Sequence, residues 1–348
     1  MSRMSRYEIR AATRQDEDEL VVLARYLNTV NLPNDRAAIR HLLDISERSF
    51  DGSIENPRDC EYVFLLRDLD RGCAAGTSMI VAQLGRPGEP YIYLDVDTEE
   101  RYSATLAKHF RHQVLSIRYV YDGPTEIGGL VVHPSYRSAP EKLGTLISYV
   151  RFLFIAMERR AFRDELLAEL LPPLEPDGTS HLWEALGRHF TDLSYSEADR
   201  LSKRNKEFIR GLFPQGEIYT SLLPPRAQAV IGAVGEQTRG VEKLLRRIGF
   251  QYAARVDPFD GGPHFTARTD EVSLVRTTRR VELSHSDAMH LTERVMIAKR
   301  IRSAPYFAAY PVLAEYRDAR TLSVDPTTLA RFEALGEGAT WVLPLAPG

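Results

Sequence analysis

The segment "LVVHPSYRSAPEKLGTLISYV" (130–150) joins an apolar strand to a helix and carries the residue types best suited to bind an anion. Arg137 lies in the connection, and Lys142, Gly144 and Thr145 lie in the first turns of the expected helix. Free backbone N–H groups and the helix dipole favour a phosphate at such a helix N-terminus, and glycine lets the phosphate approach the backbone closely. The segment therefore predicts a phosphate-binding turn. The alternative is a helix start that merely tolerates a glycine.

A second candidate is the turn "DPFDGGPHF" (257–265), which places two carboxylates beside two glycines. Asp257 and Asp260 could bind a cationic guanidinium in a bidentate manner. Gly261 and Gly262 suit, equally well, a tight turn that requires a positive φ. The two interpretations are compatible, so the turn is a candidate site for a basic substrate.

The histidines and cysteines form no metal-binding pattern. His181 and His189 lie eight residues apart on one expected helix, but no third ligand accompanies them. Cys60 and Cys73 are the only cysteines and have no CxxC spacing, which favours free thiols in a reducing cytoplasm. The sequence therefore predicts no metal.

Composition narrows the classes of partner. The 348 residues include 45 basic and 48 acidic side chains, which gives no electrostatic case for a nucleic-acid partner. No apolar run of about 18 residues and no signal peptide occur, so neither a membrane partner nor secretion is expected. These observations favour a cytoplasmic protein that acts on small molecules.

The expected elements describe an α+β fold, a mixed sheet flanked by helices, without strict βαβ alternation. A core over 1–275 is expected to contain a helical insertion at about 177–234, and 276–348 is expected to form a small β-rich C-terminal unit. Expected strands lie at 7–12, 61–68, 73–84, 127–132, 164–171 and 250–256. Expected helices lie near 99–110, 141–161 and 238–248.

Several blocks in one order resemble the arginine N-succinyltransferase family. They are "W-x-x-L-G-x-x-F" from Trp183, Ile218 and Tyr219 before "A-Q-x-V-I-G" from Ala227, and "D-x-F-D-G-G-P" from Asp257. The similarity extends from about residue 7 to the C-terminus and is strongest over 177–263. The phosphate turn also resembles the Arg-x-x-Gly-x-Gly/Ala loop of the GCN5-related N-acyltransferase fold, with Lys142 in place of the first glycine.

This resemblance implies succinyl-CoA as donor, the α-amino group of arginine as acceptor, and a step of arginine catabolism. It implies that Leu130 lines the succinyl-CoA site, and that backbone groups near Leu130 and Val132 meet the pantetheine arm. Some family members are assemblies of two related subunits, so a homodimer or a hetero-oligomer with a paralogous subunit is expected.

The chain departs from the family at two histidines. Gly235 stands where the family has a proton-donating histidine, and Ser221 stands at a second histidine position. Glu236 could serve as base and Tyr219 as acid, although each also suits a structural role. We expect weakened transfer, since positioning supplies more of the rate than acid–base catalysis, and a histidine restored at position 235 to raise it. The alternatives are a non-catalytic subunit and an acyltransferase for another amine such as ornithine.

Overall fold

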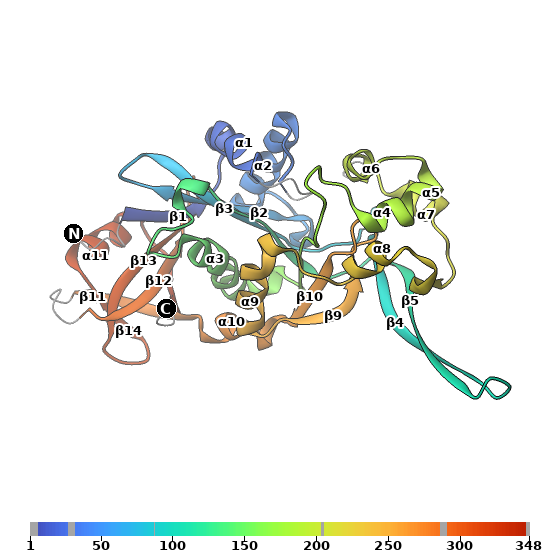
Figure 1. Cartoon of the computed structure of the whole chain (residues 1–348). Coiled ribbons are helices and arrows are strands. Elements are labelled where there is room, and N and C mark those ends of the chain that lie inside the picture. Colours follow the sequence, from blue (N-terminus) through green and yellow to red (C-terminus); the bar gives the residue numbers. More distant parts are fainter. Residues whose placement is uncertain (1–5, 27–31, 87, 203–204, 286–290, 346–348) are drawn as a thin grey trace. The chain divides into compact units, whose positions relative to one another are not determined.

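The computed structural model describes residues 6–26, 32–86, 88–202, 205–285 and 291–345 (Figure 1). The chain divides into two compact units, one made of residues 1–82, 125–164 and 269–348 and the other of residues 83–124 and 165–268. Each unit combines helices with a sheet, which confirms the α+β class. The expected boundary between residues 275 and 276 does not coincide with this division and remains a prediction about folding units.

The first unit contains a mixed sheet in the order β12-β15-β11-β14-β13-β1-β2-β3-β6. Its strands are β1 (Tyr7–Ala11), β2 (Glu61–Asp68), β3 (Cys73–Val81), β6 (Thr125–Val132), β11 (Arg279–His285), β12 (Glu293–Arg300), β13 (Phe307–Tyr316), β14 (Thr321–Val324) and β15 (Thr340–Pro344). Because β1 pairs with β13 as well as β2, the C-terminal strands continue the N-terminal sheet.

Helices cover both faces of this sheet. They are α1 (Glu17–Ala24), α2 (Arg36–Asp51), α3 (Leu143–Met157), α10 (Ser273–Thr277) and α11 (Pro326–Ala334). Side chains alternate along β2, so Val63 and Leu65 join the apolar cluster of α1 and α2, whereas Phe64 contacts Phe154 of α3. The long apolar helix expected at 141–161 is thus α3, and it positions the phosphate turn at the end of β6.

The second unit contains the sheet β7-β10-β9-β4-β5-β8. Its strands are β4 (Tyr91–Ser103), β5 (Lys108–Val120), β7 (Glu165–Glu169), β8 (Ile218–Tyr219), β9 (Gln251–Val256) and β10 (Pro263–Arg268). The helices are α4 (His181–Ala185), α5 (Gly187–Thr191), α6 (Tyr195–Ser202), α7 (Glu207–Leu212), α8 (Pro225–Val230) and α9 (Arg239–Ile248). Trp183 is fully buried here and stacks on Phe259 at 5.0 Å between ring centroids.

The helix expected near 99–110 is wrong, because these residues belong to the long β4–β5 hairpin. Nearly all side chains there are exposed, so no apolar face could stabilise a helix. The backbone pairs instead across the hairpin, with Glu99 opposite His112. Figure 1 shows the end of the hairpin extending free of the unit's helices. None of the helices in the described parts of the chain is long and apolar enough to cross a membrane.

Candidate functional site

The strand β6 carries a bulge at the position that the sequence assigns to the acyl-CoA. Val131 lies opposite Thr77 and Gly128 opposite Met79, so Gly129 and Leu130 together face one residue of β3. Gly129 has φ +57, a conformation that favours glycine. A bulge leaves backbone groups of the extra residue unpaired with the neighbouring strand. The bulge thus interrupts the regular pairing of Gly129 and Leu130 with β3, and the role of Leu130 in an acyl-CoA site stays a prediction.

The turn from β6 to α3 brings the predicted anion-binding residues together. The Arg137 Nε donates to the Val132 carbonyl at 3.2 Å, and the exposed remainder of its guanidinium carries further donors. A Cβ built on Gly144 would contact only the Val132 side chain, at 3.6 Å. Gly144 and Thr145 lie in the first turn of α3 and are half-buried. The N–H groups at the start of an α-helix generally lack a partner within it, although the Thr145 N–H donates here to the Lys142 carbonyl at 2.9 Å.

Lys142, which directly precedes α3, has φ +57 and ψ +55. This left-handed conformation is the one that glycine adopts without cost and that other residues adopt at roughly 1–3 kcal/mol. The backbone thus retains a glycine-type conformation where the resembled loop has its first glycine, and the lysine adds an exposed cationic side chain. The assignment of the segment as a phosphate loop stays a prediction.

The second unit contains the acidic turn. The Asp257 carboxylate accepts through Oδ1 from the N–H groups of Phe259 (2.7 Å) and Asp260 (3.1 Å). The Asp260 carboxylate accepts from the Gly262 N–H at 2.7 Å and from the Tyr195 hydroxyl at 3.3 Å. Both Asp260 oxygens are therefore used within the protein, whereas Asp257 keeps its Oδ2 outside these turn contacts.

Burial disfavours the charged forms of the two carboxyl groups in this turn. Burial raises the pKa of Asp257 to about 6, against the opposing effect of hydrogen bonds from the turn's backbone. Burial and the neighbouring Asp257 charge raise the pKa of Asp260 well above its usual value. Desolvated carboxylates of this kind gain most from a nearby cation. A cation near Asp257 would offset this cost, and the role of Asp257 and Asp260 in binding a basic substrate stays a prediction.

Two residues that the sequence did not single out complete a cluster with Asp257. Ligand-type atoms of Glu169, Asp257 and His264 all lie within 4.8 Å of one another. His264 is 0% exposed, its Nδ1 lies 2.7 Å from the Tyr91 hydroxyl, and its Nε2 has no hydrogen-bond partner within the described chain. The Glu169 Oε1 lies 3.4 Å from that Nε2.

Burial lowers the pKa of His264 to about 3, so the imidazole is neutral and its Nε2 can accept a hydrogen bond. Such a trio has the composition of a small cation-binding site, for a protonated nitrogen or for a metal ion. The prediction that the chain needs no metal stays a prediction. The pairing of β7 with β10, which places His264 opposite Glu169, was the missing information.

Gly235 lies against the chain that follows β7. Its N–H donates to the Leu171 carbonyl at 2.9 Å, and a Cβ built on it would lie 2.7 Å from the Pro172 oxygen. Its φ is −65°, so close approach and not a positive φ excludes a side chain. Glu236 follows in an exposed 3-10 turn (Glu236–Thr238), which leaves its carboxylate accessible.

Tyr219 makes its contacts with the β4–β5 hairpin. It pairs with Val114 of β5, its hydroxyl donates to the Glu99 carboxylate, and it accepts from Arg101 Nη2 at 3.1 Å. His181 and His189 lie on separate short helices, α4 and α5, and not on one helix as expected.

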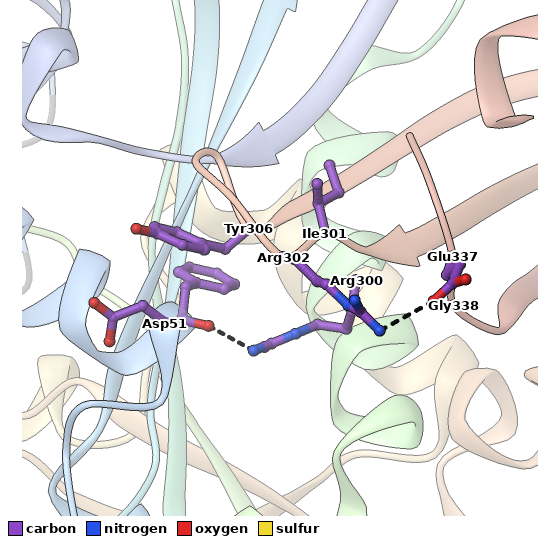
Figure 2. A pocket seen from close by; sticks show the side chains of 8 residues that line it. Asp51, Arg300, Ile301, Arg302, Tyr306, Glu337 and Gly338 are labelled. Carbon is purple, nitrogen blue, oxygen red and sulfur yellow. Dashed lines mark hydrogen bonds and ion pairs between the residues drawn. The ribbon is translucent and has the colours of Figure 1, made fainter. Parts of the chain in front are cut away.

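A pocket of about 600 Å³ lies in the first unit, lined by Phe50, Asp51, Arg300, Ile301, Arg302, Tyr306, Glu337 and Gly338. Figure 2 shows Arg302 and Glu337 turned toward each other, 3.0 Å apart. Arg300 donates to the Phe50 carbonyl. Since the two arginines already have partners and none of the predicted site residues lines the pocket, it adds nothing to the candidate site.

Comparison with known proteins identifies relatives over nearly the whole chain. The family model described as arginine N-succinyltransferase beta subunit matches residues 7–274. Arginine N-succinyltransferase subunit beta of Pseudomonas aeruginosa is 33% identical over 341 residues, which cover 97% of this chain and 98% of that protein. Arginine N-succinyltransferase of Yersinia enterocolitica is 33% identical over 271 residues, 77% of each chain.

A solved structure shows the same fold. Arginine/ornithine succinyltransferase subunit AI from Pseudomonas aeruginosa superimposes with a TM-score of 0.82 at 26% identity, covering 99% of this chain and 100% of that chain. The similarity therefore includes both compact units.

Proposed function

Because the chain belongs to the arginine N-succinyltransferase family, we propose that it transfers a succinyl group from succinyl-CoA to the α-amino group of arginine. The observation that carries this function is the β6 bulge at Leu130, which leads directly into the turn with Arg137 and the N-terminus of α3. It supplies backbone groups for an extended thioester arm and donors for its phosphates. This arrangement also supports a core of the GCN5-related type.

The deciding experiment is turnover by the purified protein. Succinyl-CoA with arginine should release free CoA thiol, and mass spectrometry should detect N-succinylarginine. Ornithine in place of arginine tests the other acceptor. Release of no thiol with either amine, despite measurable binding of succinyl-CoA, would refute the enzyme and favour a non-catalytic subunit of a larger assembly.

The cofactor turn is tested by Gly144→Glu. The new carboxylate would lie at the second position of α3, where it repels the phosphates and occupies their approach. We expect the dissociation constant for succinyl-CoA to rise at least about tenfold, equivalent to about 1.4 kcal/mol. The fold should persist, because the site of the new Cβ is free of close contacts. Isothermal titration calorimetry measures the affinity.

Gly240→Glu is the matched control for this variant. Gly240 is likewise the second residue of a helix, α9, and a Cβ there would meet nothing within 4 Å. The control adds the same charge and should leave succinyl-CoA affinity unchanged. Equal affinities of the two variants would show that the β6–α3 turn does not bind the cofactor.

For the acceptor we propose that Asp257 contacts a cationic group of the amino acid, with Glu169 and His264 beside it. Asp260 would keep the turn in the conformation that presents Asp257. Asp257→Asn should then raise the KM for arginine about tenfold while the KM for succinyl-CoA changes less than twofold. Steady-state kinetics with each substrate varied in turn measures both. If both constants change equally, or neither does, the turn is purely structural.

We further propose that positioning supplies most of the catalysis, with Glu236 as base and Tyr219 as acid. Glu236 is supported by its exposure, whereas Tyr219 would first have to exchange its contacts with Glu99 and Arg101. The names of the relatives as beta and AI subunits support an oligomer, either a homodimer or an assembly with a paralogous chain. Cys60 and Cys73 are free thiols, which supports a reducing cytoplasm.

A further inference from the structure

Arg151 is a buried cation in the middle of the apolar helix α3. Arg151 is 2% exposed and lies in the mainly apolar run "LGTLISYVRFLFIAM". Its guanidinium donates from Nε to the Ser148 carbonyl (3.1 Å), from Nη2 to the Ser148 hydroxyl (2.7 Å) and from Nη1 to the Gly128 carbonyl (3.3 Å). All three acceptors are neutral.

A buried guanidinium normally has a carboxylate partner, because leaving a charge unpaired in the interior is costly. Within the residues that the structure describes, no carboxylate forms an ion pair with Arg151, and burial alone lowers its pKa to about 9. A guanidinium has five N–H donors, and three bonds leave two of them for a further acceptor. The guanidinium can therefore take an anionic partner from a bound ligand.

The position of Arg151 relates it to the predicted cofactor site. It lies seven residues, about two turns, along α3 from Gly144, and so on the same face of the helix. Gly144 approaches Val132, whereas Arg151 bonds Gly128, four residues earlier on β6. Gly128 is half-exposed and directly precedes the bulge at Gly129 and Leu130. A cofactor whose phosphates lie at the α3 N-terminus and whose arm follows β6 would bring its acyl end toward Arg151.

We propose that Arg151 binds the distal carboxylate of the donor's acyl group and thereby selects a dicarboxylic acyl-CoA over a neutral one. The proposal rests on the proposed function, since it needs an acyl-CoA along β6. It adds the residue that would distinguish the acyl group: a succinyl group ends in a carboxylate that matches the unpaired guanidinium, whereas acetyl and butyryl groups carry no charge. A planar guanidinium can hold a carboxylate through two parallel hydrogen bonds.

The test compares equilibrium binding of succinyl-CoA and butyryl-CoA, which share chain length and differ in the terminal carboxylate. The wild-type protein should bind succinyl-CoA at least about tenfold more tightly. Arg151→Met, which retains the volume and removes the charge, should weaken succinyl-CoA binding roughly 10- to 100-fold and change butyryl-CoA binding less than threefold. Arg137→Met is the control, since loss of a phosphate contact should weaken both ligands equally.

Each outcome bears on the proposal. Equal affinity of the wild-type protein for the two thioesters overturns it, even if Arg151→Met does not fold. Equal losses for both ligands in a folded Arg151→Met, shown by an unchanged circular dichroism spectrum, also overturn it, because Arg151 would then only support β6. Because binding is measured without an acceptor, selective binding with no succinylarginine formed would refute the proposed reaction and leave this inference standing. Turnover with equal affinities would do the reverse.

Discussion

Replacing Gly235 by histidine is expected to destabilise the protein by about 3 kcal/mol and not to raise its turnover. Backbone fills the space that a side chain at position 235 would need: the oxygens of Pro172 and Leu171 lie 2.7 and 2.9 Å from where a Cβ would stand. The Gly235 N–H also donates to Leu171, which fixes the two segments together. Any side chain at position 235 must displace the backbone that follows β7. Backbone moves less easily than the end of a flexible side chain.

Urea unfolding of the variant at pH 7.5 measures the loss of unfolding free energy. Gly235→Ala should show most of this loss, because the Cβ alone produces the close contact. Gly240→His is the control, since that glycine has nothing within 4 Å and should change stability by less than about 0.5 kcal/mol. A stable Gly235→His protein with faster turnover would show that the strand end moves easily and that the site has room for the missing imidazole.

This geometry revises what the sequence suggested about Gly235. The family resemblance predicts that a histidine at position 235 would raise transfer. The φ of −65° would allow a histidine, but residues 171–172 approach too closely to leave room for its side chain. Such a contact joins segments more than 60 residues apart, and no local pattern reports it. A side chain at position 235 therefore has no room in this arrangement of the backbone.

Local patterns predicted the elements wherever a periodic apolar face exists. The β2–β3 hairpin, the strand β6, the helix α3 and the helix α9 lie close to their expected ranges. The helix near 99–110 failed because its residues have good helix propensity but no buried face, and cross-strand pairing decided the structure. Propensity is a weak guide where tertiary contacts are few.

The sequence predicted those parts of the candidate site whose residues are close together along the chain. The turn from Arg137 to Thr145 is continuous in sequence, so its chemistry was visible. Arg151 does carry a sequence signal, because it is the one cation in a mainly apolar helix. Glu169 and His264 gave no signal, since only the antiparallel register of β7 and β10 brings them together.

His264 should make the protein acid-sensitive, and its replacement by glutamine should remove that sensitivity. Burial lowers the pKa of His264 to about 3, against about 6.5 in an unfolded chain. The folded protein therefore resists a proton that the unfolded chain accepts. Stability from this group is fully present above pH 6.5 and falls as the pH drops from 6.5 toward 3. At pH 4.5 the loss amounts to about 3 kcal/mol, from roughly two pH units at 1.36 kcal/mol each.

The neighbouring groups set the experiment's design. Asp257, whose pKa is raised to about 6, acts in the opposite sense, since its folded form holds a proton that the unfolded chain loses between pH 4 and 6. Glu169 and the Tyr91 hydroxyl contact the imidazole, and the charges of Arg255 and Lys206 further oppose its protonation. The quantity to measure is therefore the difference in unfolding free energy between wild type and His264→Gln, in which the Asp257 contribution cancels to first order.

At pH 7.5 this difference reports only packing and hydrogen bonding of the two side chains. Toward pH 4.5 it should shift by about 3 kcal/mol in favour of the glutamine variant. A difference that stays constant across this range would mean that His264 takes up a proton in the folded protein, with Glu169 closing onto Nε2 as its ion-pair partner. The neutral, unpaired imidazole assigned to the acceptor cluster would then be wrong, and Asp257 would have to hold a cationic acceptor against a neighbouring positive charge.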